Sequence, residues 1–153
     1  MNRSGRRSGY FVRVFSTALA ALMAAASFSG CSVPNLDPPL CSEARTPVRE
    51  FYSLHFGNEM AVSPDVLALR RQFITDGLFE RAAAAEPGTD PFTSGSADLP
   101  KAFRVGECRV LGPERTGFDV LLFWKDDVRS EQRTISIEAV RVNGRWLVDK
   151  IVQ

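Results

Sequence analysis

His55 is the only histidine in the chain and therefore the side chain best suited to move a proton at neutral pH. Its neighbours Phe51 and Tyr52 give it an aromatic setting on one face of an expected helix. A general base also needs a positioned substrate and an orienting group, and the sequence identifies neither. His55 can equally pack within a core or rest with its ring tip at the rim of one, so a catalytic role and a packing role both stay open.

Metal and nucleophilic chemistry find no support in the residue types. A single histidine, no cysteine pair at ligand spacing, and an Asp126-Asp127 pair in an expected turn do not make a zinc ligand set. The chain has no Gly-x-Ser-x-Gly motif and no glycine-rich phosphate loop. We therefore expect no metal and no cofactor.

Three helix-start signals precede the segments that would position His55. Each signal is a serine or threonine followed by proline or aspartate, which is typical of an N-cap and first helical turn. The expected helices cover 46–57, 63–74 and 75–85, and Pro87-Gly88 ends the last one. The segment between 86 and 100 is rich in Gly, Pro, Ser, Thr and Asp and predicts a long loop that Phe92 anchors.

The pattern changes to a period of two after residue 102. Apolar residues alternate over 103–110, with a bulge expected near Gly106, and then over 118–124 and 135–139. Asn143-Gly144 is a strong type I′ hairpin signal leading into a last strand over 146–152. Three helices followed by a four-stranded meander predict an α+β fold with the helices on one face of the sheet.

Several of these segments together resemble the nuclear transport factor 2-like superfamily. The resemblance rests on the Phe51-Tyr52 pair in the first helix, the two short helices, the Asp90-Pro91-Phe92 triplet, and the closing segment NGRWLVDKI at 143–151. More narrowly, the chain is similar to the bacterial domain-of-unknown-function 3828 group, which includes many exported lipoproteins. The resemblance covers about residues 45–153.

This resemblance implies a cystatin-like cone in which a curved four-stranded antiparallel sheet wraps around the helices. The mouth of such a cone can hold a ligand or a peptide, but the fold implies no defined reaction. Enzymatic members usually set an Asp or His beside a Tyr, which would make Tyr52 the partner of His55. The candidate ligand-binding residues are Tyr52, His55, Asp90, Phe92 and Trp146.

Each of the last three candidates also has a structural interpretation. Asp90 precedes Pro91 and can cap its own loop, which its turn chemistry favours over a ligand contact. Phe92 can plug the loop onto the end of the barrel or act as a gate. Trp146 on a terminal strand is more often part of a core than a platform for stacking a ligand.

Residues 1–30 have the composition of a secretory signal peptide. Four arginines precede an apolar run over 14–28 that is shorter than the roughly 20 residues needed to cross a bilayer. The segment Phe28-Ser29-Gly30-Cys31 resembles a bacterial lipobox, although Phe28 stands where leucine is usual. We expect lipidation of Cys31 followed by a proline-rich tether over 31–44; an ordinary cleavage site and an uncleaved anchor are the alternatives.

Removing the leader changes the charge of the chain. All four leader charges are basic, so the expected mature chain has 15 basic and 18 acidic residues and a net charge of minus 3. No cluster of basic residues remains, which argues against a nucleic-acid partner. The pairs Arg70-Arg71 and Arg141/Arg145 are interpreted as solvated; contact with an anionic partner such as a lipid headgroup is the alternative.

The two remaining cysteines, Cys41 and Cys108, form an even pair if Cys31 carries lipid. In an oxidising compartment such a pair tends to cross-link, so we predict a Cys41–Cys108 disulfide; one buried and one exposed thiol is the alternative.

The sequence therefore predicts a membrane-anchored lipoprotein of the cell envelope that faces the periplasm. By similarity to sorting rules in diderm bacteria, Ser32 permits delivery to the outer membrane, which we expect over the inner membrane. The favoured function is a non-catalytic binding or adaptor module for a small hydrophobic ligand, a peptide or another envelope protein. The alternative is a small isomerase- or dehydratase-like enzyme that uses His55 and Tyr52.

Overall fold

The structure is a computed structural model that describes residues 37–152, all of which belong to one compact unit, Leu36–Gln153. The expected leader over 1–30 and the expected lipidation site Cys31 lie outside the described residues. Within 37–152, no helix is both long enough and apolar enough to cross a membrane.

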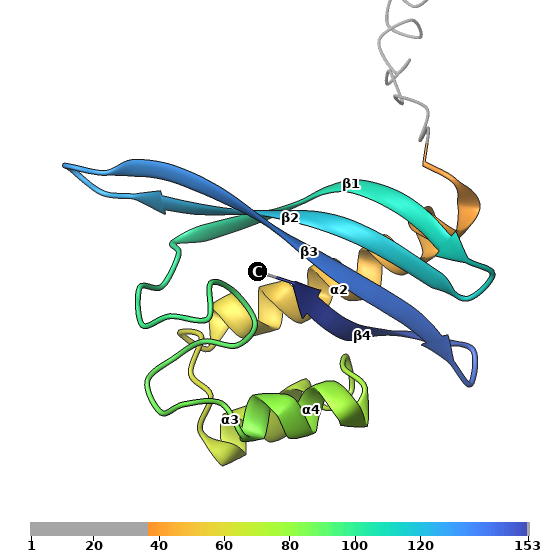
Figure 1. Cartoon of the computed structure of the whole chain (residues 1–153), viewed down its shortest axis with the longest axis horizontal. Coiled ribbons are helices and arrows are strands. Elements are labelled where there is room, and N and C mark those ends of the chain that lie inside the picture. The colour runs from red at the N-terminus through yellow and green to blue at the C-terminus, as the bar shows by residue number, and fades with distance from the viewer. Residues whose placement is uncertain (1–36, 153) are drawn as a thin grey trace, which may run out of the picture. The chain divides into compact units, whose positions relative to one another are not determined.

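The predicted α+β class is confirmed (Figure 1). Three helices are followed by one antiparallel sheet whose strands are hydrogen-bonded in the order β1-β2-β3-β4. The elements are α2 (Pro39–Gly57), α3 (Pro64–Arg70), α4 (Asp76–Ala83), β1 (Ala102–Gly112), β2 (Arg115–Lys125), β3 (Ser130–Val142) and β4 (Arg145–Val152).

The sheet follows the period-two pattern of the sequence. On β2 and β3, the alternating apolar residues are at most 4% exposed and face the helices: Phe118, Val120, Leu122, Trp124, Ile135, Ile137 and Ala139. The predicted bulge lies where the β1–β2 register shifts between Val105 and Cys108. Asn143 and Gly144 have φ angles of 51° and 76°, as a type I′ turn requires.

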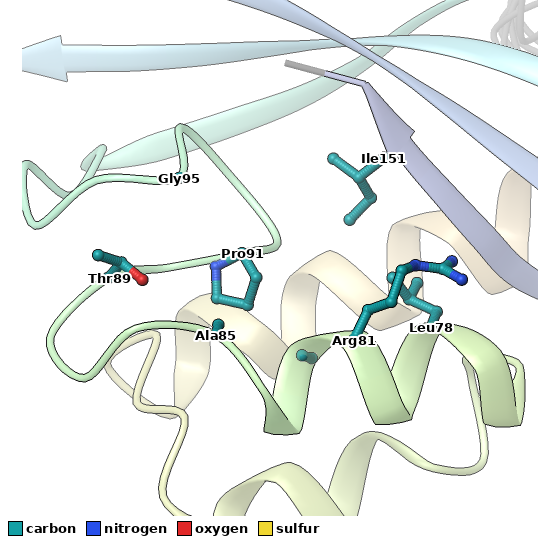
Figure 2. A pocket seen from close by; sticks show the side chains of 8 residues that line it. Leu78, Arg81, Ala85, Thr89, Pro91, Gly95 and Ile151 are labelled. Carbon is teal, nitrogen blue, oxygen red and sulfur yellow. The ribbon is translucent and has the colours of Figure 1, made fainter.

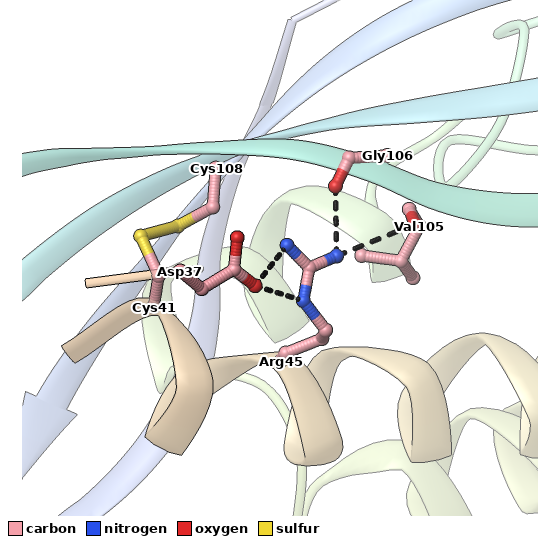
Figure 3. Close-up of a disulfide and its surroundings, with 6 residues drawn as sticks. All are labelled: Asp37, Cys41, Arg45, Val105, Gly106 and Cys108. Carbon is pink, nitrogen blue, oxygen red and sulfur yellow. Dashed lines mark hydrogen bonds and ion pairs between the residues drawn. A yellow bond between two sulfur atoms is a disulfide. The ribbon is translucent and has the colours of Figure 1, made fainter. Parts of the chain in front are cut away.

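The structure corrects the start of the first helix. α2 begins at Pro39, so the Thr46-Pro47 signal lies inside the helix and residues 39–44 of the expected tether are helical. Contacts distant in sequence stabilise these extra turns (Figure 3). Cys41 is disulfide-bonded to Cys108 on β1, and Arg45 Nη1 donates to the Gly106 carbonyl at 2.7 Å. Pro47 lacks only one helical hydrogen-bond donor, and these contacts offset that loss.

The second helix is shorter than the sequence predicts because its last residues pair with the sheet. α3 ends at Arg70, and Ile74 instead forms a parallel bridge with Val148. The Val148 N–H donates to the Phe73 carbonyl at 2.8 Å, and the Thr75 N–H donates to the Val148 carbonyl at 2.9 Å. The segment 73–75 thereby covers part of the open edge of β4.

The start of α4 is confirmed. Thr75 Oγ1 accepts a hydrogen bond from the Leu78 N–H at 3.2 Å, which is the N-cap that the sequence predicts. The helix presents Leu78 and Ala82 to the core, beside β4.

α2 lies along the inner face of the sheet and contributes the centre of the core (Figure 1). Its buried positions recur at helical spacing and include Val48, Phe51, Tyr52 and His55. The loop between α4 and β1 adds Phe92 to the same cluster, so the loop is anchored as its composition predicts.

Candidate functional site

His55 and Asp90 form a buried pair that joins α2 to the loop before β1. His55 Nε2 lies 2.9 Å from Asp90 Oδ2, and neither side chain is more than 1% exposed. Thr93 Oγ1 donates to the same carboxylate oxygen at 2.5 Å, and the Phe92 N–H donates to Oδ1 at 3.0 Å. Asp90 therefore caps its own loop, as its turn chemistry predicts, and binds the helix as well.

Tyr52 is joined to the same loop. Its hydroxyl donates to the Phe92 carbonyl at 3.0 Å, and the side chain is fully buried. Burial raises the pKa of Tyr52, and the negative charge of Asp90 raises it further. Tyr52 therefore stays protonated and acts as a hydrogen-bond donor.

Burial also lowers the pKa of His55, while the hydrogen bond and the charge of Asp90 partly oppose that change. The nearby positive charge of Arg70 lowers the pKa as well. A pKa below its ordinary value favours the uncharged ring of His55 at neutral pH, and in the tautomer with hydrogen on Nε2 that N–H donates to the Asp90 carboxylate. His55 Nδ1 is buried and makes no hydrogen bond with any residue of 37–152.

Arg70 corrects a second prediction. The sequence suggested a solvated Arg70-Arg71 pair, and Arg71 is exposed, but Arg70 is 0% exposed. Its guanidinium lies 5.6 Å from the centroid of the Phe92 ring, and none of its three nitrogens has a hydrogen-bond partner in the described part of the chain. A usable signal was present: Arg70 follows the buried Leu67 by three residues and so lies on the same helix face.

Aromatic rings surround this polar cluster. The rings of Phe51 and His55 are stacked with centroids 6.1 Å apart, and Phe92 meets the His55 ring edge to face at 5.1 Å. Tyr52 and Phe103 have centroids 5.5 Å apart. The cluster therefore excludes solvent around the His55–Asp90 pair.

Trp146, the remaining candidate, lies apart from this cluster on β4. It is 7% exposed, and its Nε1 lies 3.4 Å from a carboxylate oxygen of Glu43 on α2. Trp146 therefore packs in the core, in agreement with the structural interpretation. The structure brings Tyr52, His55, Asp90 and Phe92 together and keeps Trp146 separate.

A hollow of about 310 Å³ opens beside this loop (Figure 2). Residues of α4, the loop and β4 line it: Leu78, Arg81, Ala82, Ala85, Thr89, Pro91, Gly95 and Ile151. Figure 2 shows Thr89, Pro91 and Gly95 on the loop side and Arg81 on the helix side. The sequence reasoning did not identify this hollow, although its loop residues flank Asp90.

A second hollow of about 430 Å³ lies between α3 and α4, and its lining is mostly apolar. It shares Ala82 and Ala85 with the first hollow. A third, of about 380 Å³, lies beside Trp124 and Arg129. None of these three hollows of the described unit is lined by Tyr52, His55, Asp90, Phe92 or Trp146.

Across residues 37–152, no three His, Cys, Asp or Glu side chains are grouped so that they could hold a metal ion.

No family model matches the chain, and no curated protein matches it. A crystal structure of a protein of unknown function from Bacteroides thetaiotaomicron VPI-5482 is similar, with 20% sequence identity and a TM-score of 0.52. The match covers 93% of this chain and 99% of that chain. At this identity, the similarity shows a shared fold alone.

Proposed function

We propose that the protein is an exported lipoprotein, anchored through Cys31, whose nuclear transport factor 2-like domain is a non-catalytic binding module of the cell envelope. The leader, the lipobox-like segment and the resemblance over 45–153 support this proposal. An α+β fold with three helices and a four-stranded antiparallel sheet is compatible with a cone of that family.

One observation carries the proposed binding role. The buried bonds from His55 and Tyr52 hold Asp90 and Phe92 in place, and the residues next to them, Thr89 and Pro91, form a wall of the first hollow. The polar cluster therefore positions a binding wall and does not itself face a ligand. A wall fixed before binding reduces the entropy lost when a ligand is held.

The lining suggests the class of ligand. Leu78, Ala82, Ala85 and Ile151 supply an aliphatic surface, whereas Thr89 and Arg81 supply polar groups at its margin. The volume lies near the lower limit for small-molecule sites. This chemistry suits a small, mostly apolar molecule or a short peptide segment with one acceptor group.

The alternative enzyme would use His55 and Tyr52 as its acid and base. A general base must come within hydrogen-bond reach of the substrate proton. Both side chains are fully buried and bonded to the loop, which favours the binding module. A His55→Ala variant that folds and keeps full biological activity would exclude the enzyme.

Filling the hollow tests the binding role. We would follow the backbone amide signals of residues 31–153 by NMR during a titration with dodecanoate. Saturable shifts should cluster at Leu78, Ala85, Gly95 and Ile151, and Ala85→Trp should abolish them. Ala84→Trp is the matched control, because Ala84 is exposed and lines neither hollow beside α4. Shifts that survive in Ala85→Trp would place binding elsewhere and contradict the proposal.

The anchoring is tested separately by the intact mass of the protein from bacterial membranes. A mass equal to a chain starting at Cys31 plus acyl groups is expected. An unacylated, uncleaved chain would exclude the lipoprotein.

A further inference from the structure

Arg81 is the only charged residue among those that line the hollow of Figure 2. It follows Leu78 by three residues and precedes Ala85 by four, so the three share one face of α4 and of the turn after it. In the view of Figure 2, Pro91 and Ile151 lie between Arg81 on the helix side and the loop on the other side. The hollow therefore has a cationic side next to an aliphatic surface.

The Arg81 guanidinium is held in place at this margin. Its Nη2 donates to the Asp149 carbonyl on β4 at 2.5 Å. A Cβ atom at position 77 would lie 3.4 Å from Arg81 Nη1, so Gly77 leaves room for the guanidinium over the first turn of α4. Arg81 is therefore positioned before a ligand arrives, which reduces the entropy lost on binding.

The positive charge of Arg81 has no acidic partner. None of the carboxylates of residues 37–152 forms an ion pair with it, and its bond to β4 goes to a backbone oxygen. The Asp149 carboxylate is used elsewhere: Oδ1 accepts from Thr75 Oγ1 at 2.9 Å, and Oδ2 lies 3.3 Å from Arg115 Nη1.

Counting the neighbouring acids leaves the same excess. Glu138 pairs with both Arg115 and Lys150, and Asp76 at the start of α4 pairs with Arg71. Around this part of β4 there are thus three basic and two acidic residues: Arg81, Arg115, Lys150, Glu138 and Asp149. The one positive charge that remains belongs to Arg81.

The loop wall offers a ligand no unused donor at its polar residues. The Thr89 N–H and Oγ1 both donate to the Glu86 carbonyl, at 3.1 and 2.7 Å. The Gly95 N–H donates to the Asp90 carbonyl at 2.9 Å. The carbonyl groups of a bound peptide would find no donor on this wall, whereas an anionic group finds Arg81.

The second hollow fixes the direction of such a ligand. It shares Ala82 and Ala85 with the first hollow, its lining is mostly apolar, and its only charged lining residue is Glu86. Glu86 repels a carboxylate, and the apolar lining accepts an aliphatic chain. The charged end of the ligand is therefore directed to Arg81 and the chain toward Ala82 and Ala85.

We propose that the hollow of Figure 2 binds an aliphatic monocarboxylate. Its carboxylate pairs with Arg81, and its chain lies on Leu78, Ala82, Ala85 and Ile151. A single negative charge matches the single positive charge that Arg81 supplies, whereas a phosphate monoester would bring up to two. The inference deepens the proposed binding role of this hollow and rests on it.

Two probes of equal chain length, octanoate and 1-octanol, test the charge pairing. Each is titrated into residues 31–153, which contain the compact unit Leu36–Gln153, and dissociation constants are taken from the backbone amide shifts. Arg81→Met should weaken octanoate binding about fivefold and leave octanol binding unchanged. Unchanged octanol binding also shows that the variant keeps its fold and its hollow.

Arg145→Met is the matched control and should bind octanoate like the unaltered chain. Arg145 is also exposed, also donates to one backbone carbonyl, that of Gln72 at 2.9 Å, and lines none of the three hollows. A loss of octanoate binding that is equal in Arg145→Met and Arg81→Met would assign the attraction to the overall charge and overturn the pairing.

Other outcomes separate this inference from the proposed binding role. Octanoate binding that Ala85→Trp abolishes and Arg81→Met leaves unchanged would refute the carboxylate pairing and keep the binding role. Tighter binding of the uncharged peptide N-acetyl-dileucine amide than of octanoate would assign the hollow to peptides. Shifts with neither octanoate nor octanol would overturn the inference together with an aliphatic binding role for the hollow.

Discussion

His55 Nε2 and Asp90 Oδ2 lie 2.9 Å apart although 35 residues separate them in the chain. This bond closes the long loop onto α2 from inside the core. The Asp90 carboxylate also accepts hydrogen bonds from the Thr93 hydroxyl and the Phe92 N–H, so its oxygens are satisfied where water cannot reach them. The loop wall of the hollow in Figure 2 therefore depends on a pair that the ligand does not touch.

Asp90→Ala should lower the free energy of unfolding by about 2–4 kcal/mol, because it leaves the His55 Nε2–H, the Thr93 hydroxyl and the Phe92 N–H without their buried acceptor. Urea unfolding gives this difference. Asp127→Ala is the control at an exposed aspartate and should change it by less than about 0.5 kcal/mol. Equal effects of the two substitutions would show that the pair does not stabilise the fold.

Stability should fall as the pH decreases below about 6.5, the ordinary pKa of histidine. Burial holds the pKa of folded His55 below that value, so the unfolded chain takes up a proton that the folded chain excludes. The contribution is therefore complete above the unfolded pKa and is lost on acidification. Unfolding curves at pH 5–7.5 measure the slope. His55→Gln should flatten the slope, and an unchanged slope in that variant would assign the effect to other groups.

Arg70→Met should raise the free energy of unfolding by about 1 kcal/mol, because the buried guanidinium makes no hydrogen bond in the described unit and methionine can fill its volume. Arg71→Met serves as the control, since Arg71 is exposed and its ion pair with Asp76 contributes less than about 1 kcal/mol. A clear loss of stability in Arg70→Met would instead mean that the Asp90 carboxylate depends on the charge of Arg70.

Reducing the Cys41–Cys108 disulfide should cost about 4 kcal/mol, because the bond closes a separation of 67 residues in the unfolded chain. Residues 39–44 should then exchange their amide hydrogens fastest within α2, since the bond fastens this part of the helix to β1. Thermal unfolding with and without reductant, together with hydrogen exchange, measures both effects. Protection of 39–44 that survives reduction would show that Arg45 alone holds the helix start.

Local chemistry determined much of the fold. The alternation on β2 and β3, the Thr75 cap and the Asn143-Gly144 turn each depend on residues only a few positions apart, and all three follow the sequence. The Cys41–Cys108 disulfide could also be predicted from the sequence, because the expected lipidation of Cys31 left only two cysteines to pair.

Tertiary contacts decided the start of α2 and the end of α3. Proline at position 47 indicated a helix beginning there, but the disulfide and Arg45 stabilise earlier turns through atoms of β1. Pairing with Val148 likewise draws Ile74 out of the helix that its spacing predicted.

The candidate site shows the same division. The sequence by itself identified Tyr52, His55, Asp90 and Phe92 from their chemical types. Only the tertiary structure decided that they bind one another, that Arg70 is buried beside them, and that the open hollow lies on the other side of their loop. The physical reason is that helix caps and turns are set by neighbours in the chain, whereas burial and the pairing of charges depend on segments that become neighbours only after folding.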